Sequence, residues 1–140
     1  MKRIEIIWSV AALSIFSQAN MASAEAFRVK ATREGLVGGI TATGHRIQEN
    51  DWFVALPSRK ALKKKVYVCH QDTCLIAEVK DVGPWNSSDP YWISNMRPQA
   101  ESGIDKFGRR TSRSGIDLSD GVAYALNCGD MCNVTWEFID

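Results

Sequence analysis

The segment CLIAEVKDVGPW, residues 74–85, ends a strand-like run with a carboxylate, Asp81, and then turns at Gly83-Pro84. Turn formers directly after an apolar run indicate that a strand leaves its sheet at that point. Because Trp85 follows the rigid proline, its ring should be held near Asp81. The stretch is open to three interpretations, namely a sugar platform beside an acid, a protein-binding edge, or a lid over the core.

Short strand-like runs separated by turn residues make up most of the remaining chain. They lie at 27–31, 39–43, 52–56, 66–69, 74–80 and 133–138. In the last run Val134, Trp136 and Phe138 alternate with polar residues, as in a half-buried strand. We expect Trp136 and Trp52 to lie in the core. The sequence shows no obvious internal repeat.

One helix is expected, directly after Ser119, which can accept hydrogen bonds from the first backbone N–H groups. Gly129 follows as a stop signal. The apolar stripe of the helix consists of Leu118, Val122, Ala125 and Leu126. Several short strands with one brief helix favour a mainly β fold, a small closed barrel, over a layered α/β fold.

The N-terminal residues have the features of a secretory signal. A basic start precedes a short apolar run at 6–16, and an A-x-A cleavage site ends at Ala24. The apolar run is too short to span a bilayer. We therefore expect residues 1–24 to be a signal peptide. Residues 25–140 should form one exported domain, periplasmic or secreted, without stable membrane insertion.

The charge balance argues against nucleic-acid binding. The full chain has 17 basic and 16 acidic residues. Loss of Lys2, Arg3 and Glu5 with the leader leaves no net charge, whereas nucleic-acid binders usually carry a clear basic excess. We interpret the basic run at 59–65 as a solvated turn rather than an anion site. We expect a monomer without a cofactor.

The four cysteines form two local pairs, Cys69 with Cys74 and Cys128 with Cys132. In a reducing cytosol this spacing would suggest zinc, but an exported chain favours disulfides. A two-residue turn at 71–72 would place Cys69 opposite Cys74 and also Lys65 opposite Glu78, a favourable charge pair. We therefore predict two local disulfides and no metal.

Two further features are candidates for function. The segment 86–113 is polar and turn-rich, and loops of this length are usually functional or disordered; its aromatics argue against plain disorder.

Asp117 lies between Ile116 and Leu118, and desolvation by apolar neighbours would raise its pKa. Such an acid could protonate a glycosidic oxygen near neutral pH. The alternative is that Asp117 caps the helix or braces a turn.

Six motifs follow one another along the chain. They are TATG (41–44), VALPS (54–58), VYV (66–68), KDVGPW (80–85), GIDLSDGVAYAL (115–126) and VTWEF (134–138). In this order they resemble the RlpA-like double-psi β-barrel family, within the barwin-like and expansin-like superfamily. The match covers residues 37–138. It implies a six-stranded double-psi barrel with an open polysaccharide groove across one face.

The resemblance also implies roles for individual residues. Asp117 corresponds to the acid-like residue of the groove, and Asp81 lies near it, so these two are the catalytic candidates. Aromatic rings suit the C–H-rich faces of sugars. The candidates for substrate binding are Trp85, Tyr91, Trp92, Thr41, Thr43 and His45. The three aromatics have an alternative role in closing the barrel end.

The sequence departs from the family pattern at two positions. Val82 stands where D-R-G-P has its arginine, and Leu56 stands where peptidoglycan-cleaving members carry a histidine. His45 would compensate only if its turn folds inward. The segment between Gly83-Pro84 and Gly115 is also much longer than in close relatives.

Three functions are compatible with these residues. The first is a lytic-transglycosylase-like enzyme acting on peptidoglycan, in which Asp117 is the general acid and the 6-hydroxyl of the substrate replaces water. The second is a non-catalytic, expansin-like module that binds or loosens wall polysaccharide, peptidoglycan or a cellulose-like glycan. The third is a secreted barwin-like inhibitor or effector that makes contact through the 86–113 loop.

Overall fold

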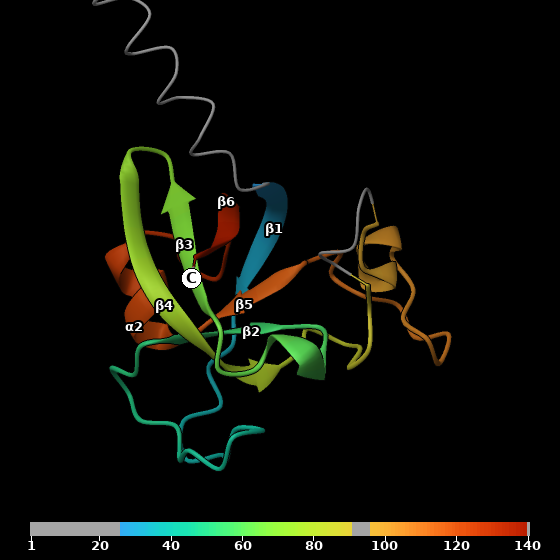
Figure 1. The fold of residues 1–140 in the computed structure, drawn as a ribbon, viewed down its shortest axis with the longest axis horizontal. Helices are drawn as coiled ribbons and strands as arrows, with labels where there is room; N and C mark the ends of the chain where they lie inside the picture. Colours follow the sequence, from blue (N-terminus) through green and yellow to red (C-terminus); the bar gives the residue numbers. More distant parts are fainter. Residues whose placement is uncertain (1–25, 91–95, 140) are drawn as a thin grey trace, which may run out of the picture.

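Six strands close into a barrel in the computed structural model, which describes residues 26–90 and 96–139 (Figure 1). The strands are β1 (Phe27–Arg33), β2 (Phe53–Leu56), β3 (Lys65–His70), β4 (Thr73–Val82), β5 (Ile116–Leu118) and β6 (Met131–Ile139). They follow the order β1-β5-β2-β4-β3-β6 around the barrel. The pairs β1–β5 and β2–β4 are parallel, and the other four are antiparallel. The predicted six-stranded, mainly β barrel with one short helix is confirmed, and its topology is consistent with a double-psi barrel.

The described part of the chain has one α-helix, α2 (Asp120–Ala125), and two short 3-10 helices, η1 (Arg59–Ala61) and η2 (Gln99–Ser102). Ser119 caps α2 as expected, because its side chain accepts a hydrogen bond from the backbone N–H of Val122. The buried face of the helix contains Ala123 rather than the predicted Ala125, which is exposed. None of the helices in the described residues is long and apolar enough to cross a membrane.

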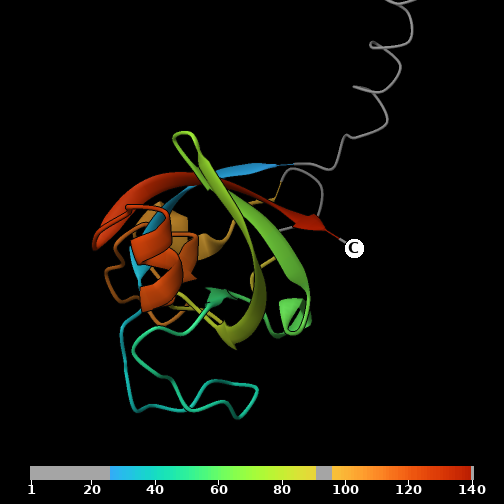
Figure 2. The same ribbon diagram turned by 90° about the vertical axis from the view of Figure 1, so that its left-hand side faces the viewer.

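The core fills the barrel with aliphatic side chains around Trp136. Its ring packs against the tilted ring of Phe27 and edge to face with Phe138, at centroid distances of 4.8 and 4.9 Å. Figure 2 shows β4 and β6 curving around this interior, with α2 at one side. The prediction that Trp52 is a core residue is wrong. Strand β2 begins one residue later, and Trp52 remains 45% exposed while its indole N–H donates to the carbonyl of Ile76.

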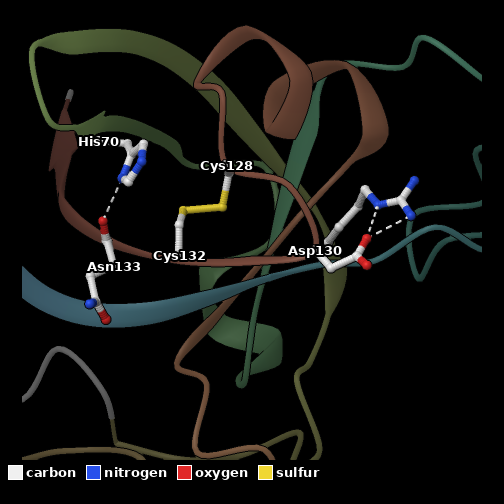
Figure 3. Close-up of a disulfide and its surroundings, with 6 residues drawn as sticks. His70, Cys128, Asp130, Cys132 and Asn133 are labelled. Atoms are coloured by element: carbon white, nitrogen blue, oxygen red, sulfur yellow. Dashed lines mark hydrogen bonds and ion pairs between the residues drawn. A yellow bond between two sulfur atoms is a disulfide. The ribbon is translucent and has the colours of Figure 1, made fainter.

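The β3–β4 hairpin has the register expected from its two-residue turn. Cys69 lies opposite Cys74 and Lys65 opposite Glu78. The structure forms both predicted disulfides, Cys69–Cys74 and Cys128–Cys132. The second ties the end of α2 to the start of β6 (Figure 3). Two disulfides in a small domain fit the oxidising environment of an extracellular protein.

One expected strand is absent from the described structure and one strand was missed. The run at 39–43 makes only a single bridge, between Ile40 and Arg46, because it bends into a tight turn. The missed strand is β5, which has only three residues and includes Leu118, expected on the apolar stripe of the helix. Such a short strand forms because β1 and β2 flank it on both sides.

The β1–β2 and β4–β5 connections contain the same structural unit, which the sequence did not reveal. GITATGHR at 39–46 and GIDKFGRR at 103–110 each form a turn closed by one bridge, and the turns have matching backbone hydrogen bonds. Gly44 and Gly108 occupy equivalent positions with φ of 89° and 80°, a conformation that favours glycine. The two halves of the barrel are therefore related by pseudo-twofold symmetry.

The described parts of the segment 86–113, which was expected as a long loop, contain η2 and lie beside the barrel, in yellow and orange at the right of Figure 1. They are held by buried polar side chains. The amide of Asn86 donates to the carboxylate of Asp89, and its carbonyl accepts from the N–H of Lys106. Asp105 is fully buried within the second turn.

Candidate functional site

Strand register brings the two predicted aspartates to one place on the outer face of the barrel. Ala55 of β2 pairs with Asp117 of β5 on one side and with Asp81 of β4 on the other. Thr32 of β1 pairs with Asp117 in turn. Ile116 and Leu118 point into the core, so the side chain of Asp117 points outward. The four residues form a row across four neighbouring strands, and the small Ala55 leaves room between the carboxyls.

Asp117 is a carboxyl that keeps its proton at unusually high pH. Burial is the main cause that raises its pKa to about 6, and the charge of Asp81 adds to it, whereas the hydrogen bond from Thr32 opposes it. Thr32 Oγ1 lies 2.5 Å from Asp117 Oδ1. The other oxygen, Oδ2, faces Gly83, where a Cβ atom would lie 3.5 Å away. The helix is capped by Ser119, so Asp117 is not needed as its cap.

Asp81 is held by the TATG turn. Its Oδ1 accepts hydrogen bonds of 2.9 Å from the backbone N–H groups of Ala42 and Val82. The hydroxyl of Thr43 anchors the turn on the carbonyl of Lys80. Thr41 is buried, and its hydroxyl contacts Thr43 Oγ1 and accepts from the backbone N–H at position 45. Both threonines thus fix the turn that presents an N–H group to Asp81.

A third carboxyl, Glu34, completes the cluster and was missed from the sequence. Burial first, then a hydrogen bond with Asp81 and the charges of Asp81 and Asp117, raise the pKa of Glu34 to about 9. Glu34 is therefore neutral at pH 7, and its O–H group donates a hydrogen bond to Asp81. Its Oε2 is buried and has no hydrogen-bond partner among the described residues. The available signal was its position just after a strand, the same kind of strand end that singled out Asp81.

A chain of hydrogen bonds links the ring of Trp85 to Asp117. Trp85 Nε1 lies 3.4 Å from Ser112 Oγ, and Ser112 Oγ lies 2.9 Å from Ser114 Oγ. Ser114 is fully buried and its hydroxyl lies 3.1 Å from that of Thr32. An ionised Asp117 can only accept, so Thr32 donates to it and must itself accept from Ser114. At the other end of the chain, the indole N–H of Trp85 can only donate, so each hydrogen bond from Trp85 to Asp117 is donated in the direction of Asp117.

Trp85 is the described aromatic beside the carboxyls. It follows a cis Gly83-Pro84 bond, and 41% of its surface is exposed. A buried lid would be covered, so the ring is available to a ligand. The other two aromatic candidates, Tyr91 and Trp92, lie outside the described residues.

Histidine does not contribute to the carboxyl cluster within the described structure. His45 Nε2 lies 2.6 Å from Asp51 Oδ2, and its ring packs edge-on against Phe53. His70 lies at the hairpin tip and bonds to the carbonyl of Asn133 (Figure 3). Leu56, at the position of the family histidine, is fully buried in the core. Residues 26–90 and 96–139 also contain no group of three or more His, Cys, Asp or Glu side chains that could hold a metal ion.

A cleft of about 380 Å³ runs along α2, and its lining does not include Glu34, Asp81 or Asp117. Arg33, the neighbour of Glu34, lines it and forms ion pairs with Asp130 at 2.8 Å and Asp120 at 3.5 Å. In Figure 3 two dashed lines join the guanidinium group to the carboxylate of Asp130. Tyr124 lines the same cleft and is 89% exposed. The cleft is therefore a concave surface with an exposed aromatic ring at its edge.

Solved structures share the barrel. The Streptomyces papain inhibitor matches with a TM-score of 0.51 and 17% identity, over 83% of this chain and 96% of that one. An expansin of Clavibacter michiganensis matches with a TM-score of 0.51 and 14% identity, over 83% of this chain but only 51% of the expansin. At these identities the likeness shows the fold alone.

At the level of sequence, a search of curated proteins finds no match. One family model does match, over residues 25–136, and therefore spans nearly the whole described barrel together with all three carboxyls. The chain belongs to the family described as Domain of unknown function (DUF8814).

Proposed function

We propose that the chain is an exported, expansin-like module that binds wall polysaccharide across the Asp117 face without cutting it. The observation that supports this most directly is the exposed ring of Trp85, tied by hydrogen bonds to Asp117. An exposed ring offers apolar area for a sugar face, and the adjacent carboxyls offer acceptors for sugar hydroxyls. In this proposal residues 1–24 direct export to the periplasm or the exterior.

Binding without cleavage is favoured by the chemistry of the cluster. A hydrolase normally needs two carboxylates with opposite roles at a defined separation. Here Glu34 is neutral and hydrogen-bonded to Asp81. The buried Leu56 cannot replace the histidine of cleaving relatives. Because the proton of Glu34 is engaged by Asp81, Asp117 is the acid among the described residues that is suited to protonate a leaving oxygen, which restricts any cleavage to a single-acid, lytic-transglycosylase reaction.

The binding test compares two tryptophans of similar exposure. The full chain is incubated with purified insoluble peptidoglycan and, separately, with cellulose, and the bound fraction is measured. Trp85→Ala should lose most of the binding. Trp52→Ala should not, although Trp52 is 45% exposed and also donates an indole hydrogen bond. Equal losses would refute the proposal, as would a wild type that binds neither of these polymers nor an acidic wall polysaccharide.

A product test separates binding from cleavage. Peptidoglycan treated with the wild type should release no 1,6-anhydro-muropeptides by mass analysis. Asp117→Asn keeps the shape but removes the acid, and it should still bind. Release of these products by the wild type and not by Asp117→Asn would instead establish lytic cleavage with Asp117 as the general acid.

Protease inhibition is a second candidate because of the β1–β2 connection. This loop exposes three apolar side chains, Leu36, Val37 and Ile40, by 67%, 55% and 56%. The Streptomyces papain inhibitor also matches over nearly its whole length. Titration of papain activity with the wild type and with Leu36→Ser tests this function. Unchanged papain activity at a large excess of the chain would exclude papain as a target.

A further inference from the structure

The turn at 103–110 presents an aromatic ring between two cations. Phe107 is 71% exposed, and the neighbouring Ile104 is 52% exposed. Lys106 Nζ lies 5.6 Å and Arg109 Cζ lies 5.4 Å from the centroid of the Phe107 ring. Both distances are within the range of cation–π contacts. The side chains therefore form one exposed surface that combines an apolar ring with positive charge.

The turn is preformed by Asp105. This carboxylate is buried and accepts hydrogen bonds from the N–H of Phe107, the N–H of Arg109 and Arg109 Nε, at 2.9, 2.8 and 2.6 Å. These bonds lower the pKa of Asp105 although burial opposes them. A preformed surface loses little conformational entropy when it binds a ligand.

The charge of this segment is unbalanced. The exposed cations of residues 103–113 are Lys106, Arg109, Arg110 and Arg113. The one carboxylate, Asp105, is paired with Arg109. Within the described residues the other three cations have no acidic partner within 4 Å. The segment therefore attracts anions.

The fold does not require these side chains. The equivalent turn at 39–46 has the same backbone hydrogen bonds with Ala42 in place of Lys106 and Thr43 in place of Phe107. The ring and the lysine are thus additions to a turn that forms without them.

The turn and the proposed sugar platform lie on the same connection, between β4 and β5. Two residues beyond Arg110, Ser112 accepts the indole hydrogen bond of Trp85. A polymer lying on Trp85 has the cationic turn on the same connection of the barrel. Through Ser112, the connection that carries the cationic turn also contacts Trp85 of the proposed site.

We propose that this cationic turn selects a polyuronate, a polysaccharide with a carboxylate on each sugar ring. A pyranose lies on Phe107 while its carboxylate binds Lys106 or Arg110. The distance of 5.6 Å from Lys106 Nζ to the centre of the Phe107 ring favours a carboxylate on the sugar ring itself over one on a long appendage. The inference rests on the proposed function, because the same glycan is taken to reach Trp85.

The test uses one polymer in two charge states. Binding of the full chain to polygalacturonate and to fully methyl-esterified polygalacturonate is measured by calorimetry at low and high salt. Only the acidic form should bind strongly, and 0.5 M salt should weaken it by screening. The double variant Lys106→Gln/Arg110→Gln should lose about tenfold in affinity, the effect of two exposed ion pairs. Phe107→Ala should lose several-fold.

A matched control removes the same charge elsewhere. Lys60→Gln/Lys63→Gln alters exposed lysines in the other basic run and should change affinity less than twofold. Equal loss in both double variants, or equal binding of acid and ester, would overturn the polyuronate inference. If the ester binds as well and depends on Trp85, the proposed function stands while the inference fails. If polygalacturonate binds, the turn variants weaken this binding and Trp85→Ala has no effect, the polyuronate inference stands and the proposed role of Trp85 fails.

Discussion

Asp117 owes its properties to a few atoms around it. Burial and the nearby Asp81 favour its neutral form, while Thr32 stabilises its charge through Oδ1. Since Oδ1 is occupied by this donor, the proton of the neutral form is placed on Oδ2, next to Gly83. Asp117 in its neutral form therefore presents its proton on one side of the carboxyl, the side that faces Gly83.

Thr32→Val should raise the pKa of Asp117 above its value of about 6. The substitution keeps the shape but removes a donor to the carboxylate, and the shift should be about one pH unit. Titration of the carboxyl carbon by NMR measures it. Thr73→Val, at the exposed tip of the β3–β4 hairpin, is the control and should leave the Asp117 titration unchanged. A wild-type titration curve in Thr32→Val would contradict the assigned role of Thr32.

Glu34 should make the protein less stable as the pH rises. Its pKa is raised by folding, so its contribution is fully present below about 4.5 and is lost progressively toward about 9. Glu34→Gln mimics the protonated side chain. It should stabilise the protein at pH 8 by about 2 kcal/mol, a modest value because water reaches part of the carboxyl, and should have no effect at pH 4.

Urea unfolding at both pH values measures this difference. Glu49→Gln removes an exposed carboxylate farther along the same connection and should not change the pH dependence. A Glu34→Gln effect of equal size at pH 4 and pH 8 would show that the carboxyl is not neutral in the folded state.

Among the secondary-structure elements, α2 depends on a close approach at its first turn. A Cβ atom at Gly121 would lie 2.4 Å from the carbonyl oxygen of Asp51 and 2.7 Å from that of Asn50. Both are backbone atoms and cannot rotate away. The backbone N–H of Gly121 also donates to Asp51 at 3.1 Å. The helix is thus seated directly on the segment that leads into β2.

Gly121→Ala should destabilise the protein by about 2 kcal/mol, because the added methyl group would clash with the carbonyl oxygens of Asn50 and Asp51 and push the helix away from them. The midpoint of urea unfolding provides the measurement. Ala125→Ser, on the exposed side of the same helix, should change stability by less than about 0.5 kcal/mol. If Gly121→Ala unfolds like the wild type, the close approach is not constrained as described.

Sequence patterns predicted the elements whose signals are local. The hairpin register followed from its two-residue turn, and the helix start followed from Ser119. β5 was missed because three residues show no period, and its strand pairing depends on distant β1 and β2. Glu34 was missed for the same reason, since only the closed barrel sets it beside Asp81. The Asp81–Asp117 pairing came from a family resemblance rather than from local pattern.

At the level of the whole molecule, every strand depends on pairing with residues far away in sequence. β1 pairs with β6, which closes the barrel between its first and last strands. One continuous core includes residues from all six strands. Such a barrel should open as one cooperative unit.

Native-state hydrogen exchange should show this cooperativity. Amides paired in β1, β3, β4 and β6 should exchange with the same free energy of opening, equal to that of global unfolding. Amides in the connections at 34–52 and 96–111 should exchange with smaller free energies, since fewer of them lie in paired strands. A strand that opened well before the others would disprove a single cooperative barrel.

The pairing of the first strand with the last has a topological consequence. Phe27 lies opposite Trp136, so the start of β1 and the end of β6 are neighbours in space. A short linker could join them, and new termini could be opened at Gln71, in the β3–β4 turn. The resulting circular permutant would run from β4 through β6 into β1 and end at β3, exchanging the order of the two pseudo-symmetric halves. Because Cys69 and Cys74 flank the opened turn, their disulfide would hold the new termini together, and the permutant should fold into the same barrel.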